Sequence, residues 1–179
     1  MPHTLLLATR NKGKIEEFRR ILEVIAPGAI NLVGLDQFPD LADVIEDGAT
    51  FEENALKKAR EMSLATGLPA IADDSGLCVD YLNGDPGIYS ARWAGSHGDD
   101  AANTEKVLQQ LRDVPDEKRG AHFTCVAALY LPDGRSHSEE AEFHGSILRA
   151  PVGEFGFGYD PIFSPHGFTE SSAQMSAEA

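Results

Sequence analysis

The sequence has few cysteines, no long apolar run and a shortage of basic residues. Only Cys78 and Cys125 occur, and neither belongs to a C-x-x-C pair, so a zinc site or a disulfide framework has no support. We expect both to be reduced thiols in the core. No stretch approaches the roughly 20 apolar residues of a membrane span, and the start lacks the basic region and apolar segment of a signal peptide. These absences predict a cytoplasmic protein.

Acidic residues dominate the charge. Fifteen Lys and Arg residues stand against 29 Asp and Glu residues, which gives a formal net charge of −14. This charge opposes long-range attraction to nucleic acid or to an anionic membrane, so we predict neither as a partner. A polyanionic ligand would need local help from cations, backbone N–H groups or a metal. The positions of the few basic residues are therefore informative.

The pattern of apolar residues predicts one α/β domain with a mixed sheet over residues 1–179. Composition is that of an ordinary globular chain, with 42% hydrophobic and 25% charged residues. Buried strands are predicted over 4–8 and 70–72, and a hairpin over 122–131 and 137–144. Helices are predicted over 14–25, over 101–112, and from a capping box at Thr50 and Glu53 to a C-cap at Gly67. Strands that alternate with helices and later pair as a hairpin favour this fold class.

A basic loop between the first strand and the first helix is the first candidate site. It contains three of the 15 Lys and Arg residues within five positions, and it consists of Thr9, Arg10, Asn11, Lys12, Gly13 and Lys14. The end of a parallel strand and the start of a helix are where α/β proteins bind phosphate groups. The loop is not a Walker A motif. The alternative is a solvated basic turn in which Thr9 or Asn11 caps the helix.

A pair of acids after the second predicted strand is the second candidate site. Asp73 and Asp74 precede Ser75 and Gly76 at the end of residues 70–72. Adjacent carboxylates leave a strand in opposite directions, so one could face a ligand while the other supports the loop. Carboxylate oxygens suit Mg²⁺, and the same carboxylate could accept a proton from an attacking water. The alternative is an acidic turn with a capping role.

A run of glycines and aromatic residues at 153–161 is the third candidate site. Glycines between aromatic residues permit close approach of the backbone to a flat ligand, and Phe157 could stack on a nucleobase. The alternative is a packed loop in which the aromatic side chains act as plugs. The aromatic content of the final segment also argues against a solvated tail. The six histidines show no spacing typical of a metal site, and we interpret them as structural or surface groups.

Taken in order, these motifs closely resemble the HAM1/RdgB-like family of non-canonical purine triphosphate pyrophosphatases, the inosine and xanthosine triphosphate pyrophosphatases. The resemblance runs from about Leu5 to the end of the chain and rests on T-R-N-K-G-K, T-F-E-E-N-A, P-A-I-A-D-D-S-G-L, P-G-I-Y-S-A-R-W-A-G and F-G-F-G-Y-D-P-I-F. It implies an elongated two-lobed fold with a long mixed sheet, flanking helices and a central cleft, assembled as a homodimer. The activity it implies is hydrolysis of ITP, dITP and XTP to the monophosphate and pyrophosphate, which removes them from the nucleotide pool.

The resemblance also implies roles for individual residues. Asp74 is similar to the family's general base and metal-linked carboxylate, and Glu46 takes the place of the second acid at a Mg²⁺ ion. Thr9, Asn11 and Lys14 would hold the triphosphate, with Arg10, Lys12 and Gly13 in the same loop. Further substrate contacts are implied for Ser75, Phe157, Gly158, Tyr159 and Asp160.

One departure from the family concerns the residues that read the base. In the family, the stretch similar to residues 173–178 continues with a lysine and a Ser-His-Arg segment that reads the oxygen at purine position 6. The sequence ends at Ala179, so we expect poor hydrolysis and blunted base preference from this chain. Two other interpretations stay open: a module that senses nucleotides without hydrolysing them, and a Maf-like pyrophosphatase, which shares the chemistry but lacks this order of motifs.

Overall fold

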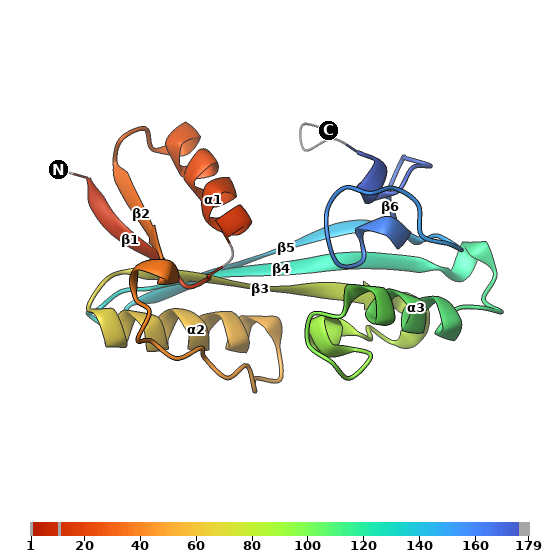
Figure 1. Ribbon diagram of the computed structural model, residues 1–179, viewed down its shortest axis with the longest axis horizontal. Coiled ribbons are helices and arrows are strands. Elements are labelled where there is room, and N and C mark those ends of the chain that lie inside the picture. Colours follow the sequence, from red (N-terminus) through yellow and green to blue (C-terminus); the bar gives the residue numbers. More distant parts are fainter. Residues whose placement is uncertain (1, 11, 176–179) are drawn as a thin grey trace. The chain divides into compact units, whose positions relative to one another are not determined.

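Six strands form one sheet in the computed structural model, which describes residues 2–10 and 12–175 (Figure 1). The strands are β1 (His3–Leu7), β2 (Ile30–Gly34), β3 (Ala70–Val79), β4 (Gly120–Tyr130), β5 (Ser136–Ile147) and β6 (Phe163–Pro165), in the order β2-β1-β3-β4-β5-β6. The helices are α1 (Lys12–Ile25), α2 (Phe51–Thr66) and α3 (Asp100–Gln110). β1 pairs in parallel with β2 and β3, whereas β5 and β6 pair antiparallel. The predicted α/β class with a mixed sheet is confirmed.

The chain divides into two compact units. Unit 1 consists of Met1–Asp74 and Val126–Glu140, and unit 2 consists of Ser75–Cys125 and Ala141–Ala179. The single domain over residues 1–179 stays a prediction, because two compact units can belong to one domain. The elongated two-lobed form with a central cleft likewise stays an expectation from the resemblance.

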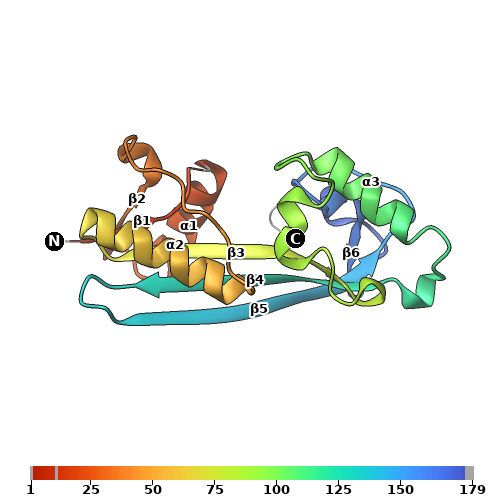
Figure 2. The ribbon, with the colours of Figure 1, turned by 90° about the horizontal axis from the view of Figure 1, so that it is seen from below.

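In unit 1, two helices cover opposite faces of the sheet. Side chains alternate along β1, so that Leu6 packs with Met62 of α2 while Leu7 packs with Ile15 of α1. Figure 1 shows α1 and α2 on opposite sides of these strands, and Figure 2 shows α2 running along β3. Neighbouring residues of β3 also face different helices, and this separates the side chains of Asp73 and Asp74.

Helix α2 begins and ends where its sequence predicts. The Thr50 hydroxyl accepts a hydrogen bond from the Glu53 N–H at 3.1 Å. The Glu53 carboxylate accepts from the Ala49 N–H at 2.7 Å, so the reciprocal contact reaches one residue further back than in a standard capping box. At the other end, Gly67 has a φ of 72° and its N–H reaches Ser63 O. A left-handed residue of this kind favours glycine.

The predicted end of the second strand at residue 72 is wrong. β3 continues without interruption to Val79, so the two acids lie within a strand. Polar residues interrupt the apolar pattern there without ending the strand, because each carboxylate has a polar partner on its own face. Asp73 contacts Lys14 of α1, and Asp74 contacts Asn54 of α2.

Unit 2 buries only part of its aromatic C-terminal segment. Tyr159 and Phe163 belong to the core that contains Val107 of α3 and Leu111, the residue directly after this helix. The packed-loop alternative does not hold for the whole segment, since the exposed fractions are 65%, 74% and 58% for Phe155, Phe157 and Phe168. This segment therefore presents aromatic rings to the surface of unit 2.

The structure bears on two predictions, one about the burial of the cysteines and one about membrane-spanning helices. Cys78 is half-buried and Cys125 is exposed, so the prediction of a core thiol is wrong for Cys125, which lies on the outward face of β4. Within residues 2–10 and 12–175, no helix has the length and apolar character needed to cross a membrane.

Candidate active site

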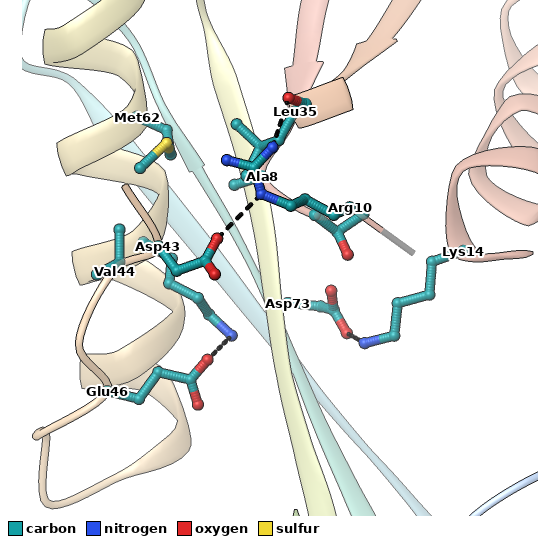
Figure 3. Close-up of a pocket in the computed structure, with 11 residues that line it drawn as sticks. Ala8, Arg10, Lys14, Leu35, Asp43, Val44, Glu46, Met62 and Asp73 are labelled. Atoms are coloured by element: carbon teal, nitrogen blue, oxygen red, sulfur yellow. Dashed lines mark hydrogen bonds and ion pairs between the residues drawn. The ribbon is translucent and has the colours of Figure 1, made fainter. Parts of the chain in front are cut away.

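A pocket of about 310 Å³ lies in unit 1, where β1 ends and α1 begins (Figure 3). Four elements or segments meet there: the end of β1, the start of α1, the segment between β2 and α2, and the facing side of α2, with β3 at the base. The pocket is lined by Ala8, Thr9, Arg10, Lys14, Leu35, Asp43, Val44, Glu46, Lys58, Met62 and Asp73. The basic loop and the paired acids, two of the three candidate sites predicted from the sequence, therefore both contribute residues to this pocket.

The two acids of β3 point in opposite directions, as their adjacency predicts. Lys14 Nζ donates to Asp73 Oδ2 at 2.6 Å on the face of α1, and Figure 3 shows these side chains pointing toward each other. Asn54 Nδ2 donates to Asp74 Oδ2 at 3.0 Å on the face of α2. Asn54 is itself held, because its side-chain oxygen accepts from the Gly48 N–H at 2.8 Å. The Asp74 carboxylate is thus oriented by a fixed amide.

Lys58 brings together the two acids that were predicted to hold a metal. Its ammonium lies 2.9 Å from Glu46 Oε1 and 3.9 Å from Asp74 Oδ1. The side chains of Lys58 and Asp74 are only 15% and 12% exposed, so the charges interact with little screening. Two carboxylates that share one cation form a suitable ligand set for Mg²⁺, which usually takes one or two carboxylates and completes its shell with water and phosphate oxygens.

Further protein ligands for a metal are absent from the part of the chain that the structure describes. In residues 2–10 and 12–175, no group of three or more His, Cys, Asp or Glu side chains could hold an ion. A Mg²⁺ ion at Glu46 and Asp74 would complete its shell with water and with phosphate oxygens, as is typical of sites at which Mg²⁺ binds together with a nucleotide.

Arg10 contacts the segment that follows β2. Its Nε donates to Asp43 Oδ1 at 3.1 Å, and its other nitrogens donate to Leu35 O at 3.1 Å and Leu41 O at 2.5 Å. A substrate contact of Arg10 stays a prediction, whereas its observed bonds tie the chain that leads to Glu46 onto the end of β1. Of the other loop residues, Asn11 lies outside the described residues, and Lys12 and Gly13 lie in the first turn of α1.

The residues of unit 2 that were predicted to contact the substrate differ in their exposure and in their hydrogen bonds. Ser75 is exposed on β3, and Phe157 is exposed in a loop whose next residue but one, Tyr159, is buried and donates from its hydroxyl to Ser90 O at 2.8 Å. Asp160 Oδ2 accepts from the Phe157 N–H at 3.0 Å. Burial raises the pKa of the Asp160 carboxyl, and the nearby charge of Asp100 raises it further. Burial also raises the pKa of Tyr159.

Lys58 and Asn54 were missed by the sequence interpretation. They lie four residues apart on α2, beside the apolar stripe that includes Ala55 and Ala59. Asn54 is only 1% exposed, and a buried polar residue next to an apolar stripe needs a partner. The spacing of four residues between Asn54 and Lys58 places both on one side of the helix, and this is the signal that could have indicated a polar site under α2.

The fold and the pocket define the class of protein: an α/β protein whose candidate site places basic side chains next to two carboxylates that share a lysine. The family model of the Ham1 family matches residues 5–179. This chain belongs to the Ham1 family. The resemblance inferred from the motifs is thereby confirmed.

Relatives with assigned activities are similar over nearly the whole chain. A dITP/XTP pyrophosphatase of Streptomyces coelicolor is 58% identical over 97% of this chain and 86% of the relative. Among solved structures, the nucleoside-triphosphatase (dITP/XTP pyrophosphatase) of Mycobacterium abscessus is 50% identical, with a TM-score of 0.84 over 98% of this chain and 90% of that one. A HAM1 protein from Coxiella burnetii is 37% identical, with a TM-score of 0.89 over 98% of this chain and 88% of that one.

Proposed function

We propose that this protein is a nucleoside-triphosphate pyrophosphatase that hydrolyses ITP, dITP and XTP to the nucleoside monophosphate and pyrophosphate. It thereby removes non-canonical purine nucleotides from the nucleotide pool, and we place this activity in the cytoplasm and in a homodimer. Membership of the Ham1 family and the names of the similar proteins support the activity. One observation carries the proposal: the Lys58 ammonium contacts both Glu46 and Asp74. Lys14 lines the same pocket as Lys58 and Glu46.

In the proposed reaction, residues of the pocket bind the phosphates, and the neighbouring Asp74 accepts a proton. Lys14 and the N–H groups at the start of α1 bind the phosphates, together with Thr9 and the rest of the basic loop. Asp74 accepts a proton from water while Asn54 fixes its orientation. The water oxygen bonds to the α-phosphorus, the bond from that phosphorus to the bridging oxygen breaks, and pyrophosphate leaves as one unit.

Glu46 and Asp74 are the proposed ligands of Mg²⁺. When bound, Mg²⁺ offsets the charge of the triphosphate and polarises the α-phosphate. Lys58 takes a related role in the protein, because its ammonium keeps two carboxylates close together that would otherwise repel each other. Phe157 is the proposed stacking partner of the base, with Gly158, Tyr159 and Asp160 around it and Ser75 as a further substrate contact.

A panel of nucleotides tests the proposed function. The protein is incubated with Mg²⁺ and ITP, dITP, XTP, ATP or GTP, and pyrophosphate and phosphate are measured separately. We expect pyrophosphate and the monophosphate as the products from ITP, dITP and XTP. Release of phosphate in place of pyrophosphate from these three nucleotides would contradict the proposal.

Replacing Lys14 by Ala is expected to raise KM for ITP about 10- to 100-fold, because a charge-assisted hydrogen bond contributes roughly 1.5–3 kcal/mol. The motive is the position of its ammonium in the pocket, 2.6 Å from Asp73. Arg20→Ala is the matched control, since it removes one positive charge from an exposed position of the same helix. Equal KM values in the two variants would show that Lys14 takes no part in phosphate binding.

A further inference from the structure

We propose that Asp100, the first residue of α3, is a positioning residue that fixes the backbone under Phe157. This inference rests on the proposed function, in which Phe157 stacks on the base. All the residues involved lie in unit 2. Asp100 would not touch the substrate and would act through the loop that carries the aromatic ring.

Two carboxylates hold two consecutive N–H groups of this loop. Asp160 Oδ2 accepts from the Phe157 N–H at 3.0 Å, and Asp100 Oδ2 accepts from the Gly158 N–H at 2.8 Å. One turn further along α3, the Thr104 hydroxyl donates to Gly158 O at 3.4 Å. Helix α3 therefore holds both polar groups of the Gly158 backbone, and hydrogen bonds to a charged acceptor are stronger than neutral ones.

The glycine before Phe157 permits this arrangement. Gly156 has a φ of 75°, which favours glycine. A side chain there would collide with the Asp160 carboxylate, so the close approach of Asp160 to the Phe157 N–H requires a glycine. The loop is thus built to keep its N–H groups against carboxylates, not to expose them to water.

The same loop leaves the Phe157 ring without cover. Phe157 is 74% exposed, whereas Tyr159, two residues on, is 5% exposed and bonded to Ser90 O. A ring on a fixed backbone loses less conformational freedom when a flat ligand stacks on it. An anchored loop under an exposed aromatic ring therefore fits a prepared stacking surface, and Asp100 is one of its anchors.

Asp100 is not needed to cap its own helix. The cap is Asp99, whose side chain accepts from the Ala102 N–H at 3.1 Å. The Asp100 carboxylate instead reaches 58 residues along the chain to Gly158. It does so although its charge disfavours ionisation of Asp160 and raises the pKa of that carboxyl. The contact with the loop thus has an electrostatic cost that a helix cap alone would not require.

Kinetics with and without a base test the inference. Asp100→Ala, Asp100→Asn and the matched control Asp99→Ala are compared with the unaltered protein for KM and kcat with ITP, and for inhibition by inorganic tripolyphosphate. We expect Asp100→Ala to raise KM for ITP by about tenfold, the effect of one charge-assisted hydrogen bond. The inhibition constant of tripolyphosphate, which has no base, should stay unchanged. Asp100→Asn should recover most of the loss, because its amide oxygen can still accept from Gly158.

The double variant Asp100→Ala/Phe157→Ala decides whether Asp100 acts through the ring. We expect it to match Phe157→Ala alone. Additive effects of the two substitutions, a parallel rise in the tripolyphosphate constant, or an equal rise of KM in Asp99→Ala would overturn the inference. Failure of the proposed function is seen separately, as absence of ITP hydrolysis by the unaltered protein. In that event calorimetric titration of the same variants with ITP gives the same comparison from dissociation constants.

Discussion

Replacing Asp74 by Asn is expected to lower kcat for ITP by about 10²- to 10⁴-fold, the usual effect of losing a general base, and to leave a folded protein. An amide cannot accept the proton of water, and it offers a divalent cation no negative charge. Its shape still fits beside Asn54 and Lys58, which contact the Asp74 carboxylate at 3.0 and 3.9 Å. Steady-state kinetics with saturating ITP and Mg²⁺ measure the loss, and circular dichroism checks the fold.

Asp73→Asn is the matched control for this experiment. Asp73 is the neighbouring acid, with a similar exposure of 11%, but it faces α1 and bonds to Lys14. Its replacement should act mainly on KM, through the position of the Lys14 ammonium. If Asp74→Asn keeps more than a tenth of the original kcat while Asp73→Asn keeps less than a tenth, the general base is Asp73.

Replacing Arg119 by Met is expected to lower the free energy of unfolding by about 3–5 kcal/mol, because it removes three hydrogen bonds from a buried charged group to carbonyl oxygens. Arg119 is 2% exposed, and its guanidinium donates to Ile147 O, Leu111 O and Leu148 O at 2.6–2.8 Å. Burial lowers the pKa of this guanidinium, and the charge of Arg149 lowers it further. These bonds join α3 to the ends of β4 and β5 in unit 2.

Denaturation in urea, followed by circular dichroism, measures this loss. Arg149→Ala is the control, because Arg149 lies nearby but is 55% exposed and pairs with the exposed Asp116. An exposed pair contributes about 1 kcal/mol or less. Equal, small losses in the two variants would show that the three hydrogen bonds of Arg119 contribute little to stability.

Elements with strong local signals could be predicted from the sequence. Thr50 and Gly67 bound α2 because capping depends on residues within one turn of the helix end. The continuation of β3 through Asp73 and Asp74 could not be predicted in this way. Two adjacent acids favour a turn on local grounds, and their place in a strand depends on Lys14 and Asn54, which come from two separate helices.

The candidate site shows the same division between local and long-range information. The basic loop could be found from its composition, since basic residues are few and cluster there, and the paired acids could be found from their adjacency. The spacing of Asn54 and Lys58 could indicate a polar site, but the partners of Lys58 could not be found, because they depend on which side of α2 faces Glu46 and Asp74. Asp100 could not be found either, since its partner Gly158 is far away in the sequence and the bond runs to a backbone N–H.

Hydrolysis of dITP in ¹⁸O-labelled water tests the central claim most directly. If water attacks the α-phosphorus, as we propose, one labelled oxygen should appear in dIMP and none in the pyrophosphate after a single turnover. Mass spectrometry of both products gives the position of the label. Label in pyrophosphate would place the attack at the β-phosphorus, and release of labelled phosphate with dIDP would place it at the γ-phosphorus. Either result would contradict the account.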